Sequence, residues 1–310
     1  MKKTKILFGA VLAIILALSC LAFTACDGTF NIDSQENVAT DASLAAFMSG
    51  VAENAGIDTE AGLPSYIAGN SYSVEYSQTL KAETEMDIVG TTIKSKQDIS
   101  TSVKGTVNIV KNMTGKLDMT MKLDQSTGGD AAGTTKMDVT AGMIVADGKI
   151  YADTKTYVSG GETSLNSDNK IAIDLSKLTD KIGDIGDFIP DTDEDTDVQL
   201  DDFIDEIKAS FSDLEIFGGV TINPTVYIKD GAMKITLGDV GYVGIKFDKE
   251  WNLEAADVVA EIKVDNSTGS GTTKTEVKLR KTGAVSVSAP SDASSYKSGD
   301  ISDIIGKVLG

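Results

Sequence analysis

The chain has 310 residues, a formal net charge of −19 and no histidine. The lack of histidine excludes the commonest general base and the commonest metal ligand. The acidic composition makes nucleic acid a poor partner, because phosphates must be neutralised by lysine and arginine. Both cysteines, Cys20 and Cys26, lie in the N-terminal apolar segment. The body of the chain can therefore form no internal disulfide, thiolate metal site or cysteine nucleophile.

Residues 1–25 have the pattern of an export signal, with three lysines before an apolar run. The run ends in Phe23-Thr24-Ala25-Cys26, which resembles the lipobox of bacterial lipoproteins, although that pattern usually has Leu where Phe23 stands. The resemblance implies cleavage before Cys26 and a covalent diacylglyceride on its sulfur. The alternatives are an uncleaved membrane anchor, or cleavage near Ala25 that leaves a free thiol.

A lipidated Cys26 would hold the protein on the outer face of the cell membrane, since two or three acyl chains give stable anchoring. In a cell with one membrane the protein would face the cell wall. In a cell with two membranes, Asp27 resembles the signal that retains lipoproteins in the inner membrane, where the protein would face the periplasm.

After the signal peptide we expect a lipidated cysteine with a polar tether at 26–40, and then one β-rich domain at 41–310. The domain begins with a helix capped by Asp41, because Leu44, Phe47, Met48 and Val51 follow the i, i+3, i+4, i+7 spacing.

From Tyr72 onward apolar and polar residues alternate, which predicts a half-buried strand of 17 residues up to Ile88. Ordinary strands have about 5–6 residues, so such a strand belongs to a large curved sheet. Asp147-Gly148 and Asp230-Gly231 predict tight hairpins and an antiparallel meander. Further segments that are expected as strands are 93–109, 117–123, 137–145, 150–158, 220–229, 233–237, 240–247, 253–264, 273–279 and 285–289.

A helical insertion is expected at about 175–217, where an apolar stripe includes Leu200, Phe203 and Ile207. A C-terminal helix is expected at 300–309. The predicted fold class is mainly β (α+β), a long-stranded curved antiparallel sheet, or half-barrel, with a few helices covering its concave face.

This order of elements, and the hairpin Val145-Ala146-Asp147-Gly148-Lys149-Ile150-Tyr151-Ala152-Asp153, resemble the mycobacterial lipid-carrier lipoproteins. The resemblance extends more distantly to the periplasmic lipoprotein carrier and its receptor. It covers roughly residues 40–290 and implies a half-barrel that binds lipid, without a catalytic motif.

An acidic run within the helical insertion has the spacing of a calcium loop. Asp191, Asp193, Asp195 and Asp202 would stand at positions 1, 3, 5 and 12 of that loop. Thr196 occupies position 6, where the loop's sharp turn requires glycine. The alternative is a solvated acidic loop whose last aspartate caps the following helix.

Five methionines share the apolar parity of the first strands: Met86, Met119, Met121, Met137 and Met143. Thioether side chains form a deformable apolar surface suited to variable ligands, although ordinary core filling gives the same pattern. The expected function is a non-enzymatic binder or carrier of a lipid or other apolar ligand, with no cofactor other than the covalent lipid. The alternative is a structural or interaction protein of the cell envelope, such as an adhesin, assembly factor or sensor subunit, whose protein partner the sequence does not identify.

Overall fold

The structure is a computed structural model that describes residues 29–54, 57–58, 63–88, 91–109, 113–128, 133–160, 163–175, 199–212, 222–266 and 269–299. Its main sheet has twelve strands in the order β14-β8-β7-β6-β5-β4-β3-β13-β12-β11-β10-β9. Their bounds are β3 Ser71–Ile88, β4 Thr91–Asn108, β5 Thr114–Thr127, β6 Gly133–Ala146, β7 Lys149–Gly160, β8 Thr163–Asp174, β9 Pro224–Lys229, β10 Ala232–Leu237, β11 Gly241–Phe247, β12 Leu253–Asn266, β13 Gly269–Thr282 and β14 Lys297–Ser298.

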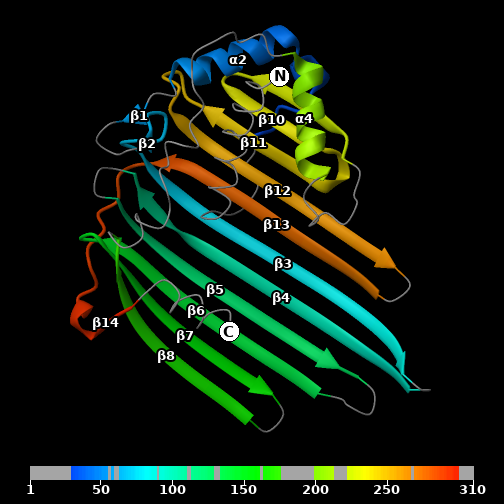
Figure 1. The fold of residues 1–310 in the computed structure, drawn as a ribbon, viewed down its shortest axis with the longest axis vertical. Coiled ribbons are helices and arrows are strands. Elements are labelled where there is room, and N and C mark those ends of the chain that lie inside the picture. The colour runs from blue at the N-terminus through cyan, green and yellow to red at the C-terminus, as the bar shows by residue number, and fades with distance from the viewer. Residues whose placement is uncertain are drawn as a thin grey trace.

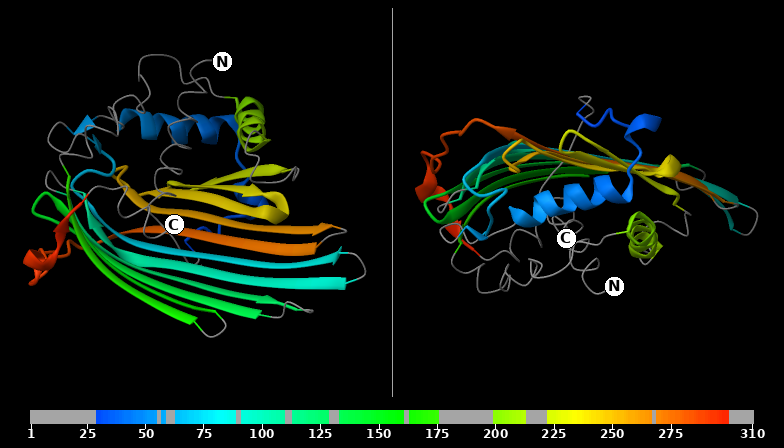
Figure 2. Two further views of the ribbon diagram at one scale, coloured as in Figure 1. Left: turned by 60° about the horizontal axis from the view of Figure 1, so that its bottom comes forward. Right: turned by 90° about the horizontal axis from the view of Figure 1, so that it is seen from above.

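Two α-helices, α2 (Asp41–Glu53) and α4 (Leu200–Ser212), belong to the described part of the chain. The short elements are β1 Ile57–Asp58, β2 Leu63–Pro64 and the 3-10 turns η1 Gln35–Asn37, η4 Gly238–Val240 and η5 Ala293–Ser295. Figures 1 and 2 show a curved sheet with both helices on its concave side. All neighbours are antiparallel except β14 and β8, and β9 and β14 form the two edges, so the sheet is open. The predicted fold class is confirmed.

The core lies between the two helices and the concave face of β3 and β9–β13. Leu44 and Met48 of α2 and Phe203 and Ile207 of α4 are fully buried there. Tyr72 of β3 is also fully buried, and its hydroxyl donates a hydrogen bond of 3.1 Å to the carbonyl of Leu253. Because successive strand residues point to opposite faces, the polar residues between these apolar ones lie on the convex face.

Both predicted two-residue turns are present. Asp147 and Gly148 have φ of 53° and 72°, and Asp230 and Gly231 have φ of 48° and 73°. This left-handed backbone at both central residues matches the right-handed twist of the strands that the turn joins. The local sequence thus determines these two hairpins.

Several elements differ from the predictions. Thr40, rather than Asp41, caps α2, and it forms a reciprocal capping box with Ser43. The segment 285–289 is not a strand, and at its first residue the side chain of Asn108 bonds the backbone where a neighbouring strand would. Its Oδ1 accepts the N–H of Val285 at 3.1 Å, and its Nδ2 donates to the carbonyl of Val285 at 2.7 Å. Strand β8 and the two-residue strands β1, β2 and β14 were not predicted.

Helix α4 lies within the range of the expected helical insertion, whose bounds stay a prediction. The expected signal peptide at 1–25, Cys26 and the expected C-terminal helix at 300–309 lie outside the described residues. No helix in the described ranges is long and apolar enough to cross a bilayer.

Candidate functional site

Four of the five predicted methionines lie side by side in the middle of the sheet. In the register of β5 and β6, Met121 pairs with Val139 and Met119 with Ala141, while Leu123 pairs with Met137. We call the two rows the methionine patch, which consists of Leu117, Met119, Met121 and Leu123 on β5 and Met137, Val139, Ala141 and Met143 on β6.

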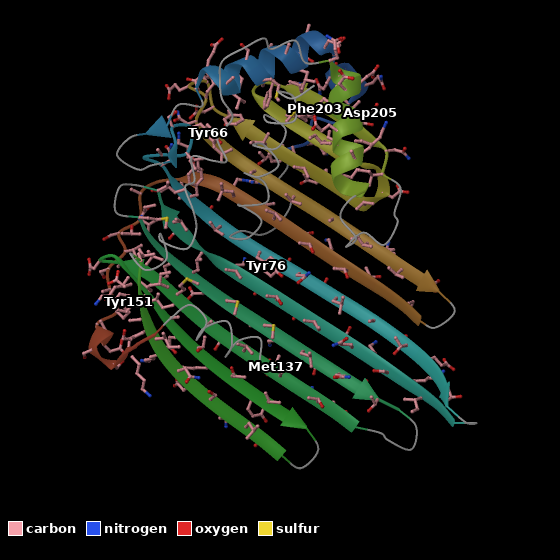
Figure 3. All side chains as sticks on the ribbon, viewed as in Figure 1. Tyr66, Tyr76, Met137, Tyr151, Phe203 and Asp205 are labelled. Carbon is pink, nitrogen blue, oxygen red and sulfur yellow. The ribbon has the colours of Figure 1, made fainter. Side chains whose placement is uncertain are left out.

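The methionine patch belongs to the concave face. Leu117, at one end of the β5 row, packs against the main core under the helices, and the other members share its parity. The four methionines are half-buried, whereas Val139 is buried. Figure 3 shows Met137 far from α4, where Phe203 is labelled. The patch therefore continues the apolar core surface beyond the two described helices.

The same apolar surface extends sideways into neighbouring strands. Val103 of β4 lies opposite Met119, and Val158 of β7 lies opposite Met137. On the next strand, Leu165 of β8 lies opposite Val158 and is 72% exposed. An exposed leucine at the end of such a row shows that apolar area on this face reaches solvent.

Met86 does not join this group. It lies near the end of β3 and pairs with Ile93 of β4, two strands away from β5. Its side chain is outside the described part of the structure, so its expected role stays a prediction.

A polar group borders the methionine patch on the concave face. The hydroxyl of Tyr76 donates a hydrogen bond of 2.7 Å to Oε1 of Gln78. Gln78 lies opposite Thr101, and Thr101 lies opposite Met121. Burial raises the pKa of Tyr76, while a hydrogen bond with Thr101 works in the opposite direction. The arrangement places hydroxyl and amide groups beside an apolar surface, which suits a ligand with a polar head. The sequence does not reveal this polar group, because its position beside the methionines depends on the pairing of β3, β4 and β5.

Only part of the acidic run lies within the described residues. Asp191, Asp193 and Asp195 lie outside the described residues, so the calcium loop stays a prediction. Asp202 is exposed in the first turn of α4. The Leu200 N–H at the start of this helix donates to Oδ1 of Asp41, at 2.8 Å, so α2 supplies a cap for α4. Within the described ranges no group of three acidic, histidine or cysteine residues could hold a metal ion.

Over β3 and β4 the convex face carries cross-strand ion pairs rather than an apolar surface. Lys94 lies 2.8 Å from Glu85, and Lys96 lies 3.1 Å from Glu83, with all four side chains more than half exposed. Exposed pairs of this kind contribute little to stability, but they keep the face hydrated. The two faces of these strands thus differ in chemistry.

A separate cavity of about 410 Å³ lies at the β8–β14 edge, and its lining is mainly polar, including Asn169, Lys170, Ser295 and Lys297. Lys170 is already occupied, because it forms ion pairs with Asp292 and Asp153. A hydrogen bond from Lys170 lowers the pKa of Asp292, in spite of some desolvation. The cavity is distinct from the methionine patch.

No known protein family matches this chain, and no curated protein matches it.

Proposed function

We propose that this protein is a lipid-anchored, extracytoplasmic binder or carrier of a lipid or another apolar ligand, without enzymatic activity. The observation that carries the proposal is the methionine patch, a surface of apolar side chains on the concave face that begins at the core with Leu117 and continues to Met137, far from α4. Large apolar surfaces outside a protein core commonly mark binding sites.

The chemistry of the patch favours a flexible ligand. Methionine side chains have three rotatable bonds and a polarizable sulfur, so they adapt to chains of different length and branching. Each methylene group that a ligand buries contributes about 0.8 kcal/mol, so a long acyl chain lying along β5 and β6 could supply several kcal/mol even if it is only half covered. The hydroxyl and amide of Tyr76 and Gln78 offer hydrogen bonds to a head group.

The test is native mass spectrometry of the chain from Asp27 onward, produced without its lipid anchor, combined with organic extraction of bound material. We expect a stoichiometric lipid or other amphiphile that is released on denaturation. The same chain, stripped of ligand, should take up lipid from vesicles of phosphatidylethanolamine and phosphatidylglycerol.

A matched pair of variants locates the site. Met121→Glu introduces a charge into the patch and should abolish lipid uptake, since an unpaired charge against an acyl chain is costly. Thr140→Glu adds the same charge at an exposed position on the convex face of β6 and should leave uptake unchanged. A ligand-free mass with no uptake would refute the proposal and favour the envelope interaction protein, whose partner would then be sought by cross-linking.

A further inference from the structure

The first described residues, 29–40, which belong to the segment expected as a tether, pack against the sheet. We call them the N-terminal strap. Phe30 is 3% exposed and packs with Ala232 of β10, Ala255 of β12 and, in part, Tyr242 of β11. A Cβ atom on Gly244 would lie 2.6 Å from the Phe30 ring, so the glycine provides the space that the ring occupies. Phe30 is thus held in a fitted site.

This site lies on the convex face. Gly244 pairs with Lys234, whose parity is opposite to that of the core residues Met233 and Ile235. The right-hand view of Figure 2 agrees, because the first blue segment runs on the side of the sheet opposite α2.

Charged groups fasten the strap on the same face. Asp33 Oδ2 lies 2.9 Å from Lys234 Nζ, and the lysine side chain is only 10% exposed. The lysine ammonium also lies 4.7 Å from the centre of the Tyr242 ring. The Arg280 guanidinium lies 5.9 Å from the centre of the Phe30 ring and forms an ion pair with Asp257.

The strap then passes around the β9 edge of the sheet. Val38 forms a β-bridge with Tyr227, and the Ala39 N–H donates a hydrogen bond of 2.8 Å to the carbonyl of Val226. The next residue, Thr40, caps α2 on the concave side. The chain thus enters the fold on the convex side and crosses to the concave side only after it has been fixed at Phe30.

From this path we infer that the strap fixes the orientation of the protein on its membrane, with the convex side of β9–β12 or the adjoining β9 edge toward the bilayer and the methionine patch directed away from it. The inference rests on the lipidation of Cys26, which is part of the proposed function. Its partner is the surface of the bilayer that holds the anchor.

Chain length limits where the anchor can leave. Cys26 precedes Phe30 by four residues, which span at most about 14 Å. From the seat of Phe30 over β11, the β9 edge is two strands away, or about 10 Å, and rounding the edge adds roughly the 10 Å depth of a packed layer. The lipid can therefore reach the bilayer from the convex side or the β9 edge, but it cannot reach the concave face while Phe30 stays in place.

The test uses the full lipidated chain in vesicles of phosphatidylethanolamine and phosphatidylglycerol that contain a lipid-borne quencher. Single cysteines carry the fluorophore, either at Lys229→Cys on the convex side of β9 or at Asp205→Cys on the outer surface of α4. Both positions are exposed. We expect quenching to be several-fold stronger at position 229 than at position 205. Equal quenching, or stronger quenching at position 205, would overturn the inference.

Two variants release the strap in different ways. Phe30→Ala removes the ring, and Gly244→Ala fills its seat, so each should abolish the difference in quenching between the two positions. Gln35→Ala, at an exposed position of the strap, should preserve the difference. Circular dichroism of each variant shows whether the sheet is intact, and a difference that persists with Phe30 released would contradict the role of the strap.

The mass of the mature chain separates this inference from the proposed function. If Cys26 carries no lipid, the anchor and the orientation are both overturned, whereas ligand extraction from the anchor-free chain still decides whether the patch binds lipid. If Cys26 is lipidated and lipid is bound, equal quenching overturns the orientation alone.

Discussion

The contact between α2 and the only tryptophan makes a quantitative prediction for Gly50→Ala. An added Cβ atom would lie 1.9 Å from Cζ2 and 2.4 Å from Cε2 of Trp251. Both distances are much shorter than a favourable carbon contact, which is about 3.5–4.0 Å. The indole is not free to move back, because its ring centre lies 5.8 Å from that of Phe47 and 5.7 Å from that of Phe247.

Two opposing effects decide whether Gly50→Ala raises or lowers the free energy of unfolding. Replacing glycine by alanine within a helix contributes about 1 kcal/mol of helix propensity. Overpacking a filled site costs about 1–3 kcal/mol, and we expect the upper part of that range because three ring atoms are involved. The free energy of unfolding of Gly50→Ala should therefore fall by about 1–2 kcal/mol, the difference between these two terms.

The assay is urea denaturation followed by circular dichroism and by the fluorescence of Trp251, which should change in the native state. Ala46→Gly, at an exposed position of the same helix, calibrates the propensity term and should lose about 1 kcal/mol. In a Trp251→Leu background the clash is absent, and Gly50→Ala should then stabilise the protein by about 1 kcal/mol. A Gly50→Ala protein that is more stable than its parent, with unchanged fluorescence, would refute the reasoning.

Three further perturbations have defined outcomes in the same urea assay. Phe203→Ala, at a fully buried position of α4, should lower the free energy of unfolding by about 3–5 kcal/mol, and a smaller loss would mean that α4 is only loosely packed. Asp257→Ala should cost about 3 kcal/mol, because the carboxylate is 2% exposed and its partner Arg280 would lose its counter-charge. Arg280→Met added to Asp257→Ala should recover part of the loss. Burial works to raise the pKa of Asp248, but hydrogen bonds, the largest from Lys281, outweigh it and hold the pKa below its ordinary value. The lowered pKa contributes stability above about pH 4 that is lost as the pH falls through it, so Asp248→Asn should flatten the acid side of the stability profile, and an unchanged profile would contradict this.

Much of the sheet could be predicted because its signals are local. The alternation of apolar and polar residues identifies the strands β3–β7 and β10–β13 and shows which face of the sheet each side chain occupies. The two Asp-Gly turns then determine which neighbouring strands pair as hairpins. Helix α4 was predictable for the same reason, since its apolar stripe follows the helical period. The joint position of Met119, Met121, Met137 and Met143 also follows from local alternation combined with one hairpin.

The features that escaped prediction depend on contacts between distant segments. Phe30 stands in a polar, aperiodic stretch, and nothing nearby in the sequence shows that Gly244 leaves space for its ring. Segment 285–289 alternates like a strand but is not one, and a side-chain amide from Asn108 takes the backbone hydrogen bonds of its first residue, Val285. The local pattern of apolar and polar residues indicates which face of a strand a residue prefers. It does not indicate which distant segment will cover that residue.

The pairing of β3 with β13 has a consequence for how the protein is made. Strands β3–β8 and β9–β13 are each joined by short connections to their neighbours, whereas β3 meets β13 along fourteen residue pairs that begin with Ser71 and Thr282. Closing so long a loop is slow compared with forming the hairpins. Until β13 pairs with β3, the meander formed by β3–β8 exposes the whole edge of the 18-residue strand β3, which can pair with other chains. During biogenesis the chain therefore passes through a stage vulnerable to aggregation, which ends when the second meander is complete.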